Sequence, residues 1–196
     1  DNPYIAPQED ATRFAGGSGM PYDPYQISNA AQLNNMRQEL GAYYTLTEDI
    51  AFSPSDFVSG GAYYHNGQGW TPIGADERYP FFGLLEGGGH TISGVTLTPS
   101  GSSPQYVGLF GGLGATIRDL NITDLTICAS FHDANQEYNS FYVGGLAGRS
   151  YNSLLEHITV SGTISAQGEE DGLYLGGIFG SGGGSYHQPV SYTHLT

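Results

Sequence analysis

The best candidates for chemistry in this sequence are three carboxylates and a histidine. They are Asp119, Asp124, Glu156 and His157. Carboxylates and an imidazole on one face can act as general acid and base in the cleavage of polysaccharides, and carboxylates can hold Ca²⁺. The same residues also fit an ordinary polar corner, since charged side chains at turns usually form a solvated surface. The sequence names these four candidates and leaves both interpretations open.

A second group of candidates is aromatic. Trp70, Tyr63, Tyr64 and Tyr79 lie in a long predicted loop over residues 53–80. Aromatic rings with polar rims can stack on sugar rings and form hydrogen bonds with them. Alternatively, the rings pack the loop onto the strands that follow. We therefore treat these four as candidate contacts to glycans or proteins, with packing as the alternative.

Metal and cofactor binding have little support in the sequence. His132 has no second His or Cys at ligand spacing, and the acidic run 169–171 fits a solvated loop as well as weak Ca²⁺ binding. We expect no metal site and no cofactor, with weak Ca²⁺ binding as the alternative. Cys128 is the only cysteine, which excludes an internal disulfide, and we expect it to be a small core residue.

An internal repeat must position these side chains. Two sets of similar segments carry it: TISGVTLT at 91–98, TIRDLNIT at 116–123 and LLEHITVS at 154–161, then YVGLFG at 106–111, YVGGLAG at 142–148 and YLGGIFG at 174–180. Repetition at this scale favours stacked coils over a closed globular core. Loops of unequal length on a constant core are typical of a parallel β-helix.

Aligning the three longer segments predicts a register. Alternate residues of a strand point inward. One inward column is Ile92, Ile117 and Leu155, and one outward row is Thr96, Asn121 and Thr159. The same alignment places Asp119 and His157 at equivalent corners, one coil apart.

Composition limits the partners. The 196 residues carry a net charge of −14 with only five basic residues, all of them Arg. Proteins that bind nucleic acids or anionic membranes use clustered Lys and Arg, so neither is an expected partner of this chain. The sequence has no run of 18 or more apolar residues that would predict a transmembrane segment.

The repeat predicts one β-helix domain over residues 21–188, with repeats over about 81–185 and a helical cap over about 28–41. Asn29 as N-cap and Gln32 at N3 form a capping box. Residues 1–20 read as a flexible lead. Residues 189–196 read as a non-native tail on a truncated chain, because VSYTHLT at 190–196 matches one translation of a sequencing adapter.

The segments FFGLLEGGGHTISGVTL, YVGLFG, YVGGLAG and YLGGIFG resemble the GLUG-motif repeat family of bacterial surface proteins. The segment YQISNAAQLNNMRQELGAYYTLTEDIAF resembles the N-terminal part that often precedes such repeats, so the resemblance covers about residues 22–185. It implies an all-β fold, a right-handed parallel β-helix of the pectate-lyase-like class, in a secreted or cell-surface bacterial protein. It carries over no catalytic residues.

These observations favour a non-catalytic β-helical segment that acts as a stalk, an adhesin or a scaffold that contacts glycans or cell-surface proteins. The alternative is a polysaccharide lyase or glycoside hydrolase that uses Asp119, Asp124 and Glu156. Carboxylates that converge on one point would favour the enzyme, whereas scattered and exposed carboxylates would disfavour it.

Overall fold

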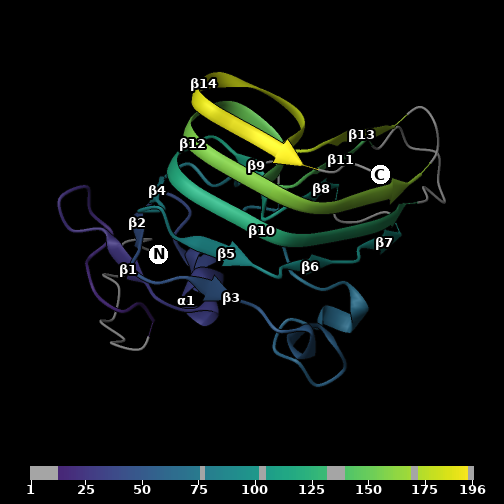
Figure 1. Ribbon diagram of the computed structural model, residues 1–196, viewed down its shortest axis with the longest axis horizontal. Coiled ribbons are helices and arrows are strands. Elements are labelled where there is room, and N and C mark those ends of the chain that lie inside the picture. Colours follow the sequence, from purple (N-terminus) through teal and green to yellow (C-terminus); the bar gives the residue numbers. More distant parts are fainter. Residues whose placement is uncertain (1–12, 76–77, 102–104, 132–139, 169–171, 194–196) are drawn as a thin grey trace, which may run out of the picture.

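Long curved strands that pair in parallel make up most of the fold. A computed structural model describes residues 13–75, 78–101, 105–131, 140–168 and 172–193. In Figure 1 three long strands lie one above another: β10 (Thr116–Phe131), β12 (Ala147–Gln167) and β14 (Phe179–Thr193). Within the described residues, every ladder between named strands is parallel. The prediction of a mostly β chain with parallel sheets is confirmed, while right-handed closure of the coils stays a prediction.

The other elements are short. The strands are β1 (Tyr25–Ile27), β2 (Tyr43–Leu46), β3 (Ile50–Ala51), β4 (Leu84–Glu86), β5 (Thr91–Ser93), β6 (Thr96–Leu97), β7 (Ser100–Gly101), β8 (Tyr106–Val107), β9 (Phe110–Leu113), β11 (Phe141–Gly144) and β13 (Leu173–Gly176). The helical segments are α1 (Ala30–Asn35), η1 (Met36–Gln38), η2 (Pro54–Phe57) and η3 (His65–Gly67). The strands of the described residues form an 11-stranded sheet, with main path β1-β2-β4-β10-β12-β14, and a three-stranded sheet ordered β13-β11-β8.

Strand β10 shows why the chain folds in this way. Its buried residues alternate with exposed or half-buried ones, as in a strand with one face on a core. Alternation shifts at Asp119 and Asp124, whose φ angles are 47° and 52°. Positive φ turns an L-residue out of the extended region, so the strand bends twice while Leu120 and Leu125 stay buried. We call the level of Asp119 the first bend and that of Asp124 the second.

The predicted register is wrong for the first of the three segments. Ile92 pairs with Ile122, which pairs with Val160, so Ile92 does not share a row with Ile117. Segment 91–98 therefore lies beside 121–128, and β4 lies beside 116–118 instead. Both alignments place apolar residues inward, so the pattern alone could not separate them. The corrected outward row is Thr91, Asn121 and Thr159.

The equivalence of Asp119 and His157 is confirmed. Arg118 pairs with Glu156 and Leu120 pairs with Ile158, which leaves Asp119 opposite His157 at the first bend. His157 has a φ angle of 52°, close to that of Asp119. The two strands therefore turn at the same level.

The three YVG-type segments stack in register in the smaller sheet. The rings of Tyr106, Tyr142 and Tyr174 stack with successive centroid distances of 5.5 and 4.8 Å. The chain turns sharply after them, and a Cβ on Gly144 would lie 2.3 Å from the carbonyl oxygen of Ala147. Only glycine fits so close an approach, which explains the glycine that follows each Tyr-Val or Tyr-Leu pair.

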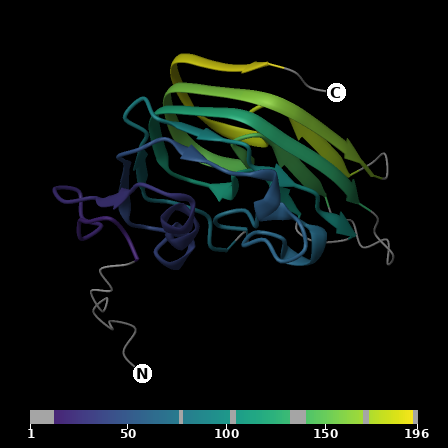
Figure 2. The same ribbon diagram turned by 60° about the horizontal axis from the view of Figure 1, so that its bottom comes forward.

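A short helix covers the N-terminal end of the stack, and β14 lies at the opposite end (Figure 2). Asn29 caps α1 as predicted, because its Oδ1 accepts a hydrogen bond from Gln32 N at 3.0 Å. The Gln32 side chain accepts from Ser28 N rather than from Asn29. The helical segment is shorter than predicted, because α1 tightens into the 3₁₀ turn η1 and ends at Gln38.

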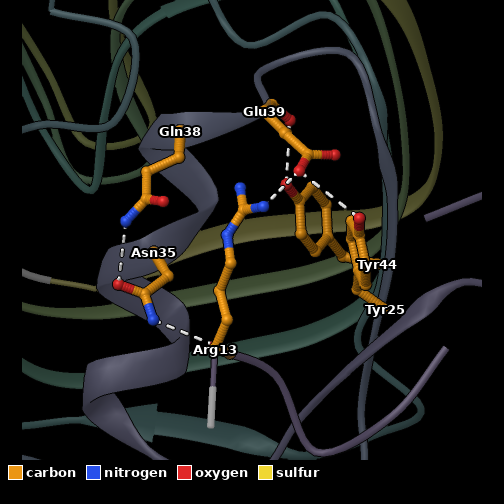
Figure 3. A network of polar contacts seen from close by, with 6 residues as sticks. All are labelled: Arg13, Tyr25, Asn35, Gln38, Glu39 and Tyr44. Carbon is orange, nitrogen blue, oxygen red and sulfur yellow. Dashed lines mark hydrogen bonds and ion pairs between the residues drawn. The ribbon is translucent and has the colours of Figure 1, made fainter. Parts of the chain in front are cut away.

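A polar network fastens this cap to the first strands (Figure 3). The Glu39 carboxylate pairs with Arg13 and accepts a hydrogen bond from the Tyr25 hydroxyl at 3.3 Å. The Tyr44 hydroxyl donates to the Glu39 carbonyl at 2.8 Å, and burial raises the pKa of this hydroxyl. Asn35 donates to the Arg13 carbonyl at 2.9 Å. The network joins residues before β1 to the end of the helical segment.

Three other expectations concern the ends of the chain and Cys128. Residues 1–12 of the predicted flexible lead lie outside the described residues, whereas Phe14 is buried and stacks on Tyr25. Residues 189–193 of the predicted tail belong to β14, and 194–196 lie outside the described residues. Cys128 is exposed, so its prediction as a core residue is wrong. In β10 its side chain points outward, whereas those of its neighbours Ile127 and Ala129 are buried.

No helix in the part of the chain that the structure describes is both long enough and apolar enough to cross a membrane.

Candidate functional site

The first bend brings Asp119 and His157 into contact. The Nδ1 atom of His157 lies 2.8 Å from Oδ1 of Asp119, and the two side chains are 57% and 47% exposed. When Nδ1 carries the proton, the carboxylate orients the ring and leaves Nε2 as an acceptor directed elsewhere. Such a pair can accept a proton or a hydrogen bond at Nε2.

The pair lines a shallow hollow with a volume of about 200 Å³. Its walls come from three neighbouring segments: the turn before β5, strand β10 and strand β12. The lining residues are Gly89, Asp119, Asn121, His157 and Thr159. Asn121 Nδ2 donates to the Gly89 carbonyl at 3.0 Å, and Gly89 N donates to the Asp119 carbonyl at 2.7 Å. These bonds hold the turn against β10 and give the hollow its shape.

The other two predicted carboxylates do not line this hollow. Glu156 lies one residue before the bend, and its Oε2 is 2.5 Å from Arg118 Nε in an ion pair between β12 and β10. Asp124 stands at the second bend, where it is exposed. The structure therefore brings together two of the four predicted residues, Asp119 and His157.

A matching pair stands at the same bend of the preceding strands. His90 Nδ1 lies 3.1 Å from Asp49 Oδ1, and the same oxygen accepts a hydrogen bond from Thr91 N at 2.9 Å. The bond from Thr91 N, with that from His90, lowers the pKa of Asp49. Asp49, His90, Asp119 and His157 thus alternate acid and base along one edge of the stack. Neither Asp49 nor His90 lines the hollow.

Sequence reasoning missed part of this site. Asn121 and Thr159 were expected only as an outward row, and Asp49 was not singled out. For Asn121 and Thr159 the signal was present, because they follow the bend residues Asp119 and His157 by two positions. Asp49 gave no such signal, since its partner His90 is 41 residues away.

Trp70 is packed rather than displayed. Its side chain is 2% exposed, and its Nε1 donates to the Leu109 carbonyl at 3.1 Å. The rings of Phe52 and Tyr63 each lie 5.5 Å from the indole, and the Arg37 guanidinium stacks over it at 5.3 Å. A ring enclosed in this way has no face left for a sugar, so the packing interpretation describes Trp70.

The three tyrosines of the aromatic group differ in exposure. Tyr63 is half-buried beside Trp70, and burial, with the charge of Asp56, raises its pKa. Tyr64 is also half-buried, while Tyr79 is 62% exposed. Their role in binding stays a prediction.

No group of three or more His, Cys, Asp or Glu side chains among the described residues is arranged to hold a metal ion. The acidic run 169–171 and His132 lie outside the described residues.

Known proteins share parts of this sequence. The chain is 32% identical over 157 residues to a protein of Evansella cellulosilytica provisionally named as a Gly-rich membrane protein; the match covers 78% of this chain and 16% of that protein. It is 33% identical over 174 residues to halomucin of Haloquadratum walsbyi, covering 85% of this chain and 2% of halomucin. The chain thus spans only small parts of these relatives.

A solved structure is also similar. It is a crystal structure of a protein from Bacteroides ovatus provisionally identified as an immunoglobulin A1 protease. The two share 18% identity with a TM-score of 0.49, over 91% of this chain and 67% of the other.

A family model described as "The GLUG motif" matches residues 139–165, which include β11 and most of β12. This segment holds YVGGLAG, the first bend at His157 and one wall of the hollow. The resemblance seen in the sequence is therefore confirmed: this chain carries a GLUG motif.

Proposed function

We propose that this chain is a right-handed parallel β-helical segment that serves as a non-catalytic stalk or scaffold in a large secreted or cell-surface protein. The observation that carries the proposal is the pairing of β10 with β12. It runs in parallel from Thr116–Leu154 to Ser130–Gln167 and crosses both bends. Strands that bend together and keep one apolar face inward are the unit from which solenoids are built.

The relatives support a place in a large surface protein. Both exceed this chain many times in length, and one carries a membrane protein's name. Solenoid segments are suited to long proteins because each repeat contacts only its neighbours, so length can be added without a new core. As partners for such a segment we propose glycans or cell-surface proteins.

Polysaccharide cleavage has weaker geometric support. Lyases and hydrolases of this kind place two or more charged groups around one bond. Among the described residues, Asp119 is the only carboxylate that lines the hollow, and Glu156 is engaged with Arg118. Asp119 and His157 remain the residues to test for this alternative.

Force spectroscopy tests the scaffold. The full chain is held between two marker domains and pulled from its ends. A stack of repeats is expected to lengthen in successive steps that each release about one repeat, because only neighbouring repeats are coupled. Release of the chain in one step from a single cooperative core would contradict the stacked arrangement.

An activity assay tests the non-catalytic part. The chain is incubated with neutral and acidic polysaccharides while new reducing ends and unsaturated products are measured. We expect neither product. Cleavage that Asp119→Asn abolishes and Asp49→Asn leaves unchanged would indicate an enzyme instead of a scaffold, since Asp119 lines the hollow and Asp49 does not.

A further inference from the structure

We propose that the hollow at the first bend binds a single neutral sugar residue, as a weak subsite for a glycan that runs along the edge of the stack. This inference goes beyond the scaffold role and names a ligand class for one site on it. It is carried by the side chains that converge on the hollow, from Asp119, Asn121, His157 and Thr159.

The hollow offers both acceptors and donors to hydroxyl groups. The Asp119 carboxylate is an acceptor, and one of its oxygens is engaged by His157 Nδ1. With the proton on Nδ1, the His157 Nε2 atom is a second acceptor. The Thr159 hydroxyl and the second N–H of the Asn121 amide can donate. A sugar ring presents neighbouring hydroxyls that donate and accept at once, which matches this mixed set.

The size of the hollow suits one ring. Its volume of about 200 Å³ is below the roughly 300–1,000 Å³ of pockets that enclose drug-sized ligands. Among the described residues no aromatic side chain lines it, so we expect the binding energy to come from hydrogen bonds rather than from stacking. Each such bond adds little net affinity, because the sugar hydroxyl gives up a hydrogen bond to water in order to form it. We therefore expect a Kd in the millimolar range.

Charge selects a neutral sugar over an acidic one. The chain has a net charge of −14, and Asp119 is the only Asp, Glu or Arg side chain among the described residues that lines the hollow. The guanidinium of Arg118, the residue before Asp119 in β10, is paired with Glu156. A uronic acid would place its carboxylate against Asp119 without a compensating cation, and juxtaposed like charges are unfavourable.

The matched control is built into the fold. His90 and Asp49 form the same kind of pair at the same bend, 3.1 Å apart, but do not line the hollow. A ligand of the hollow must perturb His157 and spare His90. A nonspecific effect of added sugar, on the solvent or on exposed histidines in general, would shift the resonances of His157 and His90 alike.

The experiment is an NMR titration of the full chain, with histidine resonances assigned through His157→Gln and His90→Gln. The probes are the methyl glycosides of glucose, galactose and mannose, with methyl glucuronoside as the acidic comparison. The expected result is a saturable shift of His157 with at least one neutral glycoside and no saturable shift of His90. Asn121→Ala and Thr159→Val are each expected to raise the Kd several-fold.

Three outcomes would overturn the proposal: no saturable shift of His157, equal shifts of both histidines, or tighter binding of the glucuronoside than of every neutral glycoside. Circular dichroism of each variant separates lost binding from lost folding. A negative result would not contradict the proposed scaffold role, because that role is tested by force spectroscopy and not by sugar binding.

Discussion

His157 and Asp119 share a backbone conformation as well as a hydrogen bond. Their φ angles are 52° and 47°, and their side chains meet at 2.8 Å across β12 and β10. Both strands must turn at this level, and positive φ is sterically unfavourable for every residue with a Cβ, although Asn, Asp and His adopt it more often than the others. The pair therefore combines local strain with a contact that joins neighbouring repeats.

The strain predicts an unusual order of stability at His157. His157→Gly and His157→Ala both lose the bond to Asp119, but only alanine keeps a Cβ in the left-handed region. We expect the alanine variant to be less stable by about 1 kcal/mol, measured by urea unfolding. The control is Ser165, at a regular position of β12, where the glycine variant should be the less stable one. The same order at both positions would contradict the role of the bend.

The turn after Tyr142 predicts a strong effect of one methyl group. In Gly144→Ala the new Cβ would lie 2.3 Å from the Ala147 carbonyl oxygen, so the backbone must shift. We expect a loss of about 1–3 kcal/mol in the free energy of unfolding. Gly183→Ala is the matched control, because a Cβ there meets nothing within 4 Å. Equal losses in the two variants would show that close approach is not what requires glycine at 144.

Trp70 is expected to act through packing. Trp70→Ala removes the contacts with Phe52 and Tyr63 and should lower the free energy of unfolding by about 3–5 kcal/mol. Trp70→Phe keeps an aromatic ring and loses the bond to Leu109, so it should cost less. Circular dichroism must be used, since Trp70 is the only tryptophan.

The comparison for Trp70 is Tyr79→Ala, at a side chain that is 62% exposed. This variant should change stability by no more than about 0.5 kcal/mol. If Tyr79→Ala were as unstable as Trp70→Ala, burial would not explain how much each aromatic side chain contributes to the free energy of unfolding.

Asp49 predicts a dependence of stability on pH. Hydrogen bonds from Thr91 N and His90 lower its pKa in the folded chain below the ordinary value of 3.8. The ionised carboxylate therefore stabilises the fold fully above the unfolded pKa, and this contribution is lost as the pH falls through the folded pKa. Urea unfolding between about pH 5 and pH 2 should show a smaller loss of stability on acidification for Asp49→Asn than for the parent chain.

Asp124→Asn is the control for that titration, since Asp124 is an exposed carboxylate at a bend with no hydrogen bond among the described residues. The comparison shows whether loss of any exposed carboxylate has the same effect as loss of the hydrogen-bonded Asp49. An Asp49 variant that follows the parent curve would rule out the contribution of its two hydrogen bonds.

Several parts of the fold were predictable because they depend on neighbours in sequence. Alternation of buried and exposed residues along β10 follows from the two-residue period of a strand. The Asn29 cap was predictable because its side chain accepts a hydrogen bond from the backbone N–H of Gln32, only three residues later. The repeat of β8, β11 and β13 was also indicated by a local signal, the short glycine-rich motif that recurs in each, although the stacking of their tyrosine rings was not predicted.

The register of the first segment was not predictable from the same pattern. Ile92 fits beside Ile117 or Ile122 equally well, because both are inward β10 residues and the two positions differ by five residues across a bend. Only the backbone conformation at Asp119 and Asp124, with the turn at Gly87–His90 bonded to β10, selects Ile122. At a bend the alternation of inward and outward residues shifts by one position. The inward positions after a bend therefore cannot be deduced from those before it.

The sequence by itself determined that this chain repeats, that its strands bury one face and that Asp119 and His157 occupy equivalent places. Tertiary structure decided which side chains share a surface: Asp119 and His157 join Asn121 and Thr159, while Glu156 pairs with Arg118 and Trp70 is enclosed. The physical reason is distance along the chain. Periodicity and caps arise within a few residues, whereas His157 meets Asp119 across 38 positions and Trp70 meets Leu109 across 39.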